Sequence, residues 1–177
     1  MTETKRRRID QIQSPDFIAD LGSLDTDELR RRRQICSDLD TELSYYRRLL
    51  HGRMDLLAFE MRRRSGEEER SLLEALPEIL AGGAMSGPGF PERLVSVDIP
   101  NIPQTGRRAI DKVLADDFLT RLSGMAEDDL NETESRLTEV ELEVSRQRRT
   151  VFDAYDAVQA EITRRYRDGT TGDDAPA

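Results

Sequence analysis

One segment of the chain occurs twice, at an offset of 101 residues. Residues 21–64 align with residues 122–165 without a gap, and 11 of the 44 aligned pairs are identical. Polar residues are among the identical pairs, such as Ser44 with Ser145. A duplicated coil must keep its apolar seam, but it has no need of a serine at a fixed place. The duplication therefore predicts two equivalent halves and a binding surface that uses both.

Both copies carry an apolar series at sevenfold spacing, which is typical of coiled-coil a positions. The series are Leu29, Cys36, Leu43, Leu50 and Leu57 in the first copy, and Leu130, Leu137, Val144, Val151 and Val158 in the second. Arg32 and Arg53 interrupt the d series of the first copy. Charged residues make up 36% of the 177 residues and aromatic residues 5%, which suits long exposed helices. The sequence therefore predicts an all-α fold built on a long two-helix coiled coil.

Composition and turn signals divide the chain into five segments. The predicted segments are a disordered basic arm (1–16), the first motif helix of the coiled coil (17–66), a short helix with a Pro/Gly-rich linker (67–107), an accessory helix with the second motif helix (108–168), and a disordered tail (169–177). The two motif helices are connected by enough chain to pair in either direction.

Capping residues set the expected bounds of the two long helices. The first helix should start near residues 25–27, where Asp25 is among the credible caps, and should stop at Ser65 before a glycine. The second should run from about residue 125 to 166, with Ser123 as its cap.

The connecting region is expected to contain shorter accessory helices. A short amphipathic helix over residues 67–80 should bend or end near Pro77. Residues 81–103 are rich in proline and glycine and are predicted to be a linker. Residues 104–122 carry one apolar face and are predicted to be helical again.

Charge and cysteine content restrict the class of protein. The net charge of −9 argues against direct DNA binding, although clustered arginines permit a local anion site. Cys36 is the one cysteine and lies on the apolar series, so we expect a core thiol and no internal disulfide. No signal peptide opens the chain and no apolar run approaches the roughly 18–20 residues that span a bilayer. We therefore expect a cytoplasmic protein without a membrane partner.

A polar stripe follows the apolar seam in each copy. Its five positions are Asp40, Ser44, Arg47, His51 and Asp55 in the first copy, and Glu141, Ser145, Arg148, Phe152 and Asp156 in the second. The spacing of 4, 3, 4 and 4 keeps each set within a narrow arc over roughly 22 Å of helix. Both stripes begin at an e position, and antiparallel coils bring e against e. We therefore predict antiparallel helices that place both stripes on one pseudo-twofold face.

The residue types of the stripe suit a ligand with guanines and phosphates. Carboxylates accept the N1 and N2 protons of guanine, and arginine donates in a fork to guanine O6 and N7 or to phosphate. Serine hydroxyls also suit phosphate oxygens. Cyclic di-GMP has this chemistry and a twofold axis. The alternative is that the acids and arginines form ordinary ion pairs on the solvated flank of a coil.

The sequence has few of the histidines and cysteines that often serve in catalysis or metal binding. His51 is the only histidine, and the chain has no cluster of cysteine and histidine. No Gly-rich phosphate loop opens a predicted helix. We therefore expect neither an enzyme nor a metal site.

The duplicated stripe resembles the signature of the actinobacterial anti-sigma factors of the RsiG type. That signature is Glu-x3-Ser-x2-Arg-x3-Gln-x3-Asp on each of two helices of an antiparallel coiled coil. The first copy departs from it at Asp40 and His51, and the second copy departs at Phe152. The resemblance covers both long helices and their order.

This resemblance implies a regulatory switch. A dimer of cyclic di-GMP, held by the ten stripe residues, would permit binding of a WhiG-type sigma factor that serves sporulation or development. The sigma factor would be kept from core RNA polymerase, and the protein would be a monomer when free. In place of the family glutamine, His51 could donate a hydrogen bond and Phe152 could stack on a base. The alternative is a coiled-coil scaffold or interaction protein that ignores nucleotides.

Overall fold

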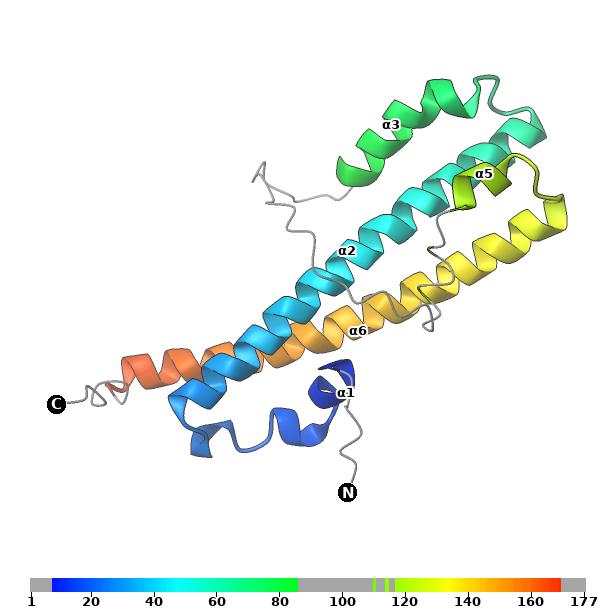
Figure 1. The fold of residues 1–177 in the computed structure, drawn as a ribbon. Helices are drawn as coiled ribbons and strands as arrows, with labels where there is room; N and C mark the ends of the chain where they lie inside the picture. Colours follow the sequence, from blue (N-terminus) through cyan, green and yellow to red (C-terminus); the bar gives the residue numbers. More distant parts are fainter. Residues whose placement is uncertain (1–7, 86–109, 111–113, 115–116, 170–177) are drawn as a thin grey trace. The chain divides into compact units, whose positions relative to one another are not determined.

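The computed structural model describes residues 8–85, 110, 114 and 117–169, and every regular element in these residues is helical (Figure 1). The elements are α1 (Arg8–Ile12), the 3-10 helices η1 (Pro15–Phe17) and η2 (Leu21–Ser23), α2 (Thr26–Ser65), α3 (Leu72–Met85), α5 (Phe118–Leu122) and α6 (Glu127–Arg167). The prediction of an all-α fold is confirmed for this part of the chain. None of its helices is long and apolar enough to cross a membrane.

Local signals set the ends of α2, as the sequence predicts. The backbone N–H of Glu28 donates to Asp25 Oδ1 at 2.6 Å, which caps the first turn. Acidic residues in the first turn and three arginines in the last turn complement the helix dipole. Gly66 follows with φ of 83°, a left-handed conformation that glycine adopts without steric cost.

The predicted bounds of the second long helix are confirmed within two residues. Helix α6 begins with three acidic residues in its first turn and ends with a basic last turn. The prediction that Ser123 caps this helix is wrong. Ser123 instead ends α5, and its backbone N–H contacts the carbonyl of Arg121.

The ten predicted seam positions form the core along both helices. Their exposed fractions are between 0% and 5% for Leu29, Cys36, Leu43, Leu50, Leu57, Leu130, Leu137, Val144, Val151 and Val158. Burial raises the pKa of the Cys36 thiol to about 11, so this cysteine is an inert core residue, as the sequence predicts. The seam thus buries the predicted residues, while its coiled-coil geometry stays a prediction.

The chain divides into two compact units, each of which takes part of both long helices. Unit 1 comprises Met1–Leu43 and Arg146–Ala177. Within unit 1, Arg33 Nη1 donates to Gln159 Oε1 at 3.1 Å. Farther along α2, Asp40 accepts from Arg148, which lies earlier on α6. The two helical segments of unit 1 are therefore antiparallel.

Unit 2 comprises Ser44–Ser145 and shows the same direction of pairing. Arg47 Nε donates to Glu141 Oε1 at 3.2 Å. Farther along α2, Arg64 Nη1 donates at 2.6 Å to the carbonyl of Met125, just before α6 begins. Later positions on α2 thus meet earlier positions on the second long segment in this unit too.

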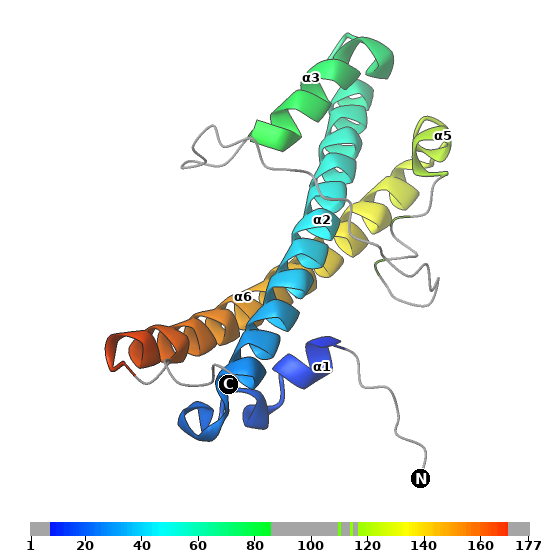
Figure 2. The same ribbon diagram turned by 60° about the vertical axis from the view of Figure 1, so that its left-hand side comes forward.

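The N-terminal segment packs alongside the first half of α2 (Figures 1 and 2). Arg8 Nη2 lies 2.8 Å from Oε2 of Glu42, which is only 5% exposed. Ile12 and Phe17 are buried as well. The prediction of a disordered arm over residues 1–16 is therefore wrong for residues 8–16, because these residues supply a counter-ion and apolar surface to unit 1. Residues 1–7 lie outside the described residues.

Helix α3 starts at Leu72, inside the helix predicted over residues 67–80, and continues past Pro77 to Met85, so both predicted ends are wrong. Ser71 and Glu74 form a capping box, in which Glu74 Oε2 accepts from the Ser71 N–H at 2.7 Å and the Glu74 N–H donates to Ser71 Oγ at 3.3 Å. Pro77 leaves the carbonyl of Leu73 without its helical donor, and Leu73 is 82% exposed, so water can serve that carbonyl.

The predicted linker and the predicted accessory helix are described only in part. Residues 81–85 of the linker belong to α3, and its remaining residues lie outside the described ones. The helix predicted over 104–122 is represented by α5 and residues 110 and 114. Leu122 is fully buried, whereas Leu119 is 49% exposed, so the predicted apolar face is buried only in part.

Candidate functional site

The ten stripe residues fall into two half-sites, one in each unit. Half-site 1 consists of Asp40, Arg148, Phe152 and Asp156 in unit 1, and half-site 2 consists of Ser44, Arg47, His51, Asp55, Glu141 and Ser145 in unit 2. Asp55, Phe152 and Asp156 are exposed, and the other seven residues are partly exposed. No stripe residue is part of the buried core, so each can reach a ligand.

Half-site 1 is built around one ion pair between the long helices. Arg148 Nε donates to Asp40 Oδ1 at 2.9 Å, and the two side chains are 37% and 38% exposed. Phe152 and Asp156 follow Arg148 at intervals of four residues, which places them on the same face of α6. The half-site therefore offers a guanidinium, an aromatic ring and carboxylates along one accessible stretch of helix.

Half-site 2 gathers three donors on a single carboxylate oxygen. Glu141 Oε1 accepts from Ser145 Oγ at 2.8 Å, from His51 Nε2 at 3.1 Å and from Arg47 Nε at 3.2 Å. The Glu141 side chain is 16% exposed. Burial raises the pKa of this carboxyl, but the hydrogen bonds from Ser145, His51 and Arg47 outweigh burial and hold the pKa below its ordinary value. Glu141 is thus a carboxylate near neutral pH.

The two half-sites share a reciprocal pairing that relates the two copies. Arg148 from the second copy pairs with Asp40 of the first, and Arg47 from the first copy pairs with Glu141 of the second. Both contacts thus join the arginine of one copy to the first acid of the stripe in the other copy. The sequence predicts these residues for one surface but does not identify the pairs. The common face for both stripes stays a prediction.

Such a pair keeps a guanidinium and a carboxylate together at an accessible place. A partly exposed ion pair contributes only about 0–1 kcal/mol, because water screens it. An anionic ligand can therefore take Arg148 from Asp40 at little cost, whereas the acid of Arg47 is less exposed and holds two further donors. The freed carboxylate can then accept hydrogen bonds from the N–H groups of a base edge.

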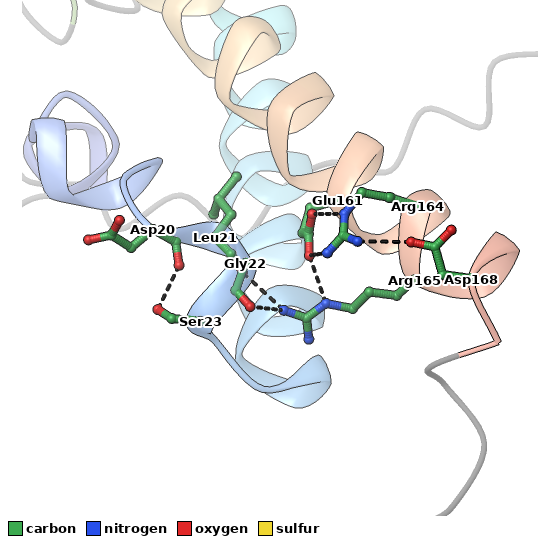
Figure 3. Close-up of polar contacts among 8 residues, drawn as sticks. All are labelled: Asp20, Leu21, Gly22, Ser23, Glu161, Arg164, Arg165 and Asp168. Carbon is green, nitrogen blue, oxygen red and sulfur yellow. Dashed lines mark hydrogen bonds and ion pairs between the residues drawn. The ribbon is translucent and has the colours of Figure 1, made fainter.

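A second duplicated contact, which the sequence analysis missed, joins the end of α6 to the connector before α2 in unit 1 (Figure 3). Glu161 accepts from both Arg164 and Arg165 at 2.8 Å. Arg165 Nη2 also donates to the carbonyls of Leu21 and Gly22, each at 3.1 Å. We call this arrangement the unit 1 latch.

Unit 2 contains the equivalent latch at the end of α2. Glu60, which is 1% exposed, accepts from Arg63 and Arg64 at 2.8 Å. Besides its bond to Met125, Arg64 donates to the carbonyls of Leu122 and Ser123, each at 3.2 Å. Leu122 corresponds to Leu21 in the repeat, so both latches join the same aligned positions.

The signal for the latches was present in the sequence, since their residues form three of the identical pairs of the repeat. The repeat also extends upstream, because Phe17 aligns with Phe118. Arg32 lies over the ring of Phe17, 5.3 Å from its centroid, and Arg53 lies over that of Phe118 at 5.0 Å. These cation–π contacts account for two arginines at d positions of α2.

The fold and the half-sites define a helical protein with polar, accessible pairs and, in the residues that the structure describes, no cluster of His, Cys, Asp or Glu suited to a metal ion. Residues 15–80 match the model of the RsiG-like family. The resemblance to anti-sigma factors of the RsiG type is thereby confirmed, and the chain is RsiG-like over the segment that holds α2 and the first stripe.

This family consists of regulatory, non-enzymatic anti-sigma factors, and its match implies a sigma factor as partner. The second copy of the stripe lies beyond the matched residues. No curated protein matches the chain.

Proposed function

We propose that this protein is an anti-sigma factor that binds cyclic di-GMP, as a dimer, on its duplicated stripe. In the ligand-bound form it holds a WhiG-type sigma factor away from core RNA polymerase. The long helices act as an antiparallel coiled coil that presents both half-sites. The protein works in the cytoplasm, and its regulon serves sporulation or development.

The observation that carries this proposal is the reciprocal pairing of the two half-sites. The pairs Asp40–Arg148 and Glu141–Arg47 repeat the same contact with the two copies exchanged. A ligand with its own twofold axis, such as cyclic di-GMP, presents two equal sets of guanine and phosphate groups. Each of these sets can be met by an arginine and its paired acid, which both half-sites contain.

Each residue type has a defined part in this binding. Arg47 and Arg148 exchange their carboxylate partners for phosphate or for guanine O6 and N7. Asp55 and Asp156, which are both exposed, accept the N1 and N2 protons of guanine. Ser145 supplies a hydroxyl that donates to the Glu141 carboxylate in the free protein and can donate to a phosphate oxygen of the ligand.

The switch follows from ligand occupancy. When cyclic di-GMP is bound, its charges and the stripe together complete the surface that receives the sigma factor. When the nucleotide concentration falls, the ligand dissociates and the arginines return to their acids. The sigma factor is then released to RNA polymerase.

A nucleotide-independent scaffold is the second candidate, and one observation favours it. Both stripe arginines are already paired with acids inside the protein, as expected of a solvated coil flank. A scaffold of this kind would bind its partners equally well with or without guanine nucleotides.

The test is a double variant, Asp55→Asn with Asp156→Asn, in a sigma-capture assay with cyclic di-GMP. Asparagine preserves size but replaces one carboxylate oxygen with a donor that would face the guanine protons. The variant should lose cyclic di-GMP and sigma capture while its melting temperature stays unchanged. Sigma capture equal to that of the unmodified protein would refute the nucleotide switch and favour the nucleotide-independent scaffold.

A matched control is the double variant Asp38→Asn with Asp153→Asn. Both aspartates are exposed and lie on the same two helices, but outside the stripe. This control should bind nucleotide and sigma factor normally. Cyclic di-AMP should not replace cyclic di-GMP with the unmodified protein, because adenine lacks the protons that the aspartates read.

A further inference from the structure

The two copies of the stripe differ in chemical class at one of five positions. His51 in the first copy corresponds to Phe152 in the second, whereas the other four positions keep an acid, a serine, an arginine and an acid. The imidazole of His51 is bonded to Glu141, while Phe152 is 50% exposed. The half-sites that hold these residues are therefore different surfaces before any ligand arrives.

Half-site 2 is closed by its own hydrogen bonds. Three donors converge on Glu141 Oε1, and this carboxylate is mostly removed from water. Arg47 Nε and His51 Nε2 are two of those donors, so these nitrogens can reach a ligand only after they leave the carboxylate, although the two side chains are 40% and 41% exposed. Because a weakly hydrated carboxylate loses more when its donors leave, this opening has a cost that binding must offset.

In half-site 1, the Phe152 ring can meet a ligand without first breaking a hydrogen bond. The ring of Phe152 is half exposed and lies four residues from Arg148 on the same face of α6. An exposed ring beside a guanidinium is a stacking platform for a planar base. The Asp40–Arg148 pair itself is more than a third exposed on both sides, so water already competes with it.

We propose that the two half-sites recognise cyclic di-GMP unequally. Half-site 1 binds a guanine by stacking it on Phe152, and it supplies most of the affinity. Half-site 2 binds guanine only when the nucleotide displaces Arg47 and His51 from Glu141. This inference rests on the proposed function and names the residues that make its two halves differ.

The test compares Phe152→Gln with His51→Gln, since each variant places the glutamine of the RsiG-type signature at the equivalent position. Phe152→Gln removes the stacking surface and should weaken cyclic di-GMP binding by about tenfold or more in calorimetry. His51→Gln keeps a donor at the position and should stay within about threefold of the unmodified protein. Phe152→Leu, which keeps apolar area without a ring, should resemble Phe152→Gln.

Helicity measured by circular dichroism checks that the variants remain folded, which the exposure of Phe152 predicts. Equal losses of affinity in the two glutamine variants, or no loss in Phe152→Gln, would overturn the inequality of the half-sites but not the proposed function. Absence of cyclic di-GMP binding by the unmodified protein would overturn both.

His51 gives an independent signal, because it is the only histidine of the chain and its ring resonances need no assignment by mutation. In tag-free protein, saturation with cyclic di-GMP should shift the imidazole nitrogen resonances as Nε2 leaves Glu141. Unchanged resonances at saturation would show that half-site 2 stays closed and would contradict the displacement step.

Discussion

The two latches and the two half-sites are products of the same duplication, yet only the latches have stayed alike. Each latch consists of a glutamate and two arginines, and each reaches the same aligned carbonyl, of Leu21 or Leu122. The half-sites keep their reciprocal arginine pairs but differ at His51 and Phe152. The latches therefore serve the architecture that both copies need, whereas the half-sites differ at the position that, as we propose, makes them recognise the ligand unequally.

A physical reason underlies this difference. Arg64 and Arg165 each bind at least two backbone carbonyls at once, and no other side chain has the forked donors that make these bonds together. A stripe position at the surface contacts few protein atoms, and substitution there changes ligand recognition more than stability. Identity between the copies thus marks structural constraint at the latches, and the difference between His51 and Phe152 is compatible with the unequal half-sites that we propose.

Removing the carbonyl-binding arginine of each latch should cause the greatest losses of stability, and it tests whether the two latches are equivalent. Arg64→Ala and Arg165→Ala should each lower the free energy of unfolding by about 2–4 kcal/mol, because each leaves backbone carbonyls without their donor and removes one of the two arginines that pair with the latch glutamate. Chemical denaturation followed by circular dichroism measures the loss.

Arg63→Ala is the matched control for the unit 2 latch. Arg63 pairs with the same Glu60 as its neighbour, and the described residues of the connector give its guanidinium no hydrogen bond. Its loss should be about 1 kcal/mol or less. A loss as large as that of Arg64→Ala would mean that the connector carbonyls contribute little, and the latch would be no more than an ion pair.

Much of the fold could be predicted from the sequence, because its signals are local. The cap at Asp25 and the glycine after Ser65 set the ends of α2, and sevenfold spacing identified all ten seam positions. The helix at Arg8–Ile12 was missed because its stability depends on a buried glutamate 34 residues away, which no local pattern reveals.

The site was predicted only at the level of its stripes. Spacing places the stripe residues on one face of each helix, but it does not fix the axial register between two helices. The pairing of Arg47 with Glu141 and of Arg148 with Asp40 depends on that register. The set of three donors on Glu141 also depends on His51, whose aligned residue in the second copy is Phe152.

The next effect separates ligand affinity from stability at the half-sites. Arg47→Ala and Arg148→Ala should each remove a charge-assisted contact to cyclic di-GMP, about 1.5–3 kcal/mol of binding free energy. The helices should stay folded, since neither arginine belongs to the seam. Unchanged nucleotide binding in both variants, with normal helicity, would show that the stripe is an ordinary solvated surface and not a binding site.

Acid should weaken the latches before it weakens the seam. The arginines of the latches lower the pKa of Glu60 and hold that of Glu161 at about 2, below the ordinary value of 4.5. Because the folded-state pKa values are depressed, the stabilisation is complete above pH 4.5 and is lost as the pH falls toward 2. The melting temperature should drop over this window.

Glutamine variants of the two latch glutamates identify the source of that drop. Glu60→Gln and Glu161→Gln should each lower the melting temperature at pH 7 and flatten its fall between pH 4.5 and 2. A fall as steep as in the unmodified protein would assign the acid sensitivity to other carboxylates.

The smallest expected effect concerns the arginines that stack on the upstream aromatic rings. Phe118→Leu should cost about 0.5–1 kcal/mol of unfolding free energy through loss of the cation–π contact with Arg53, measured by denaturation. Phe17→Leu should cost more, because Phe17 is buried at 8% exposure and fills the core of unit 1. Equal losses in the two variants would mean that burial does not distinguish these aligned rings.

Calorimetric titration of the unmodified protein with cyclic di-GMP, with and without a WhiG-type sigma factor, decides whether the protein is a nucleotide-dependent anti-sigma factor. We expect saturable binding of two nucleotide molecules per chain, tighter in the presence of the sigma factor, and no binding of cyclic di-AMP. No heat of binding under either condition, with sigma capture unaffected by nucleotide, would show that the protein is a helical scaffold instead.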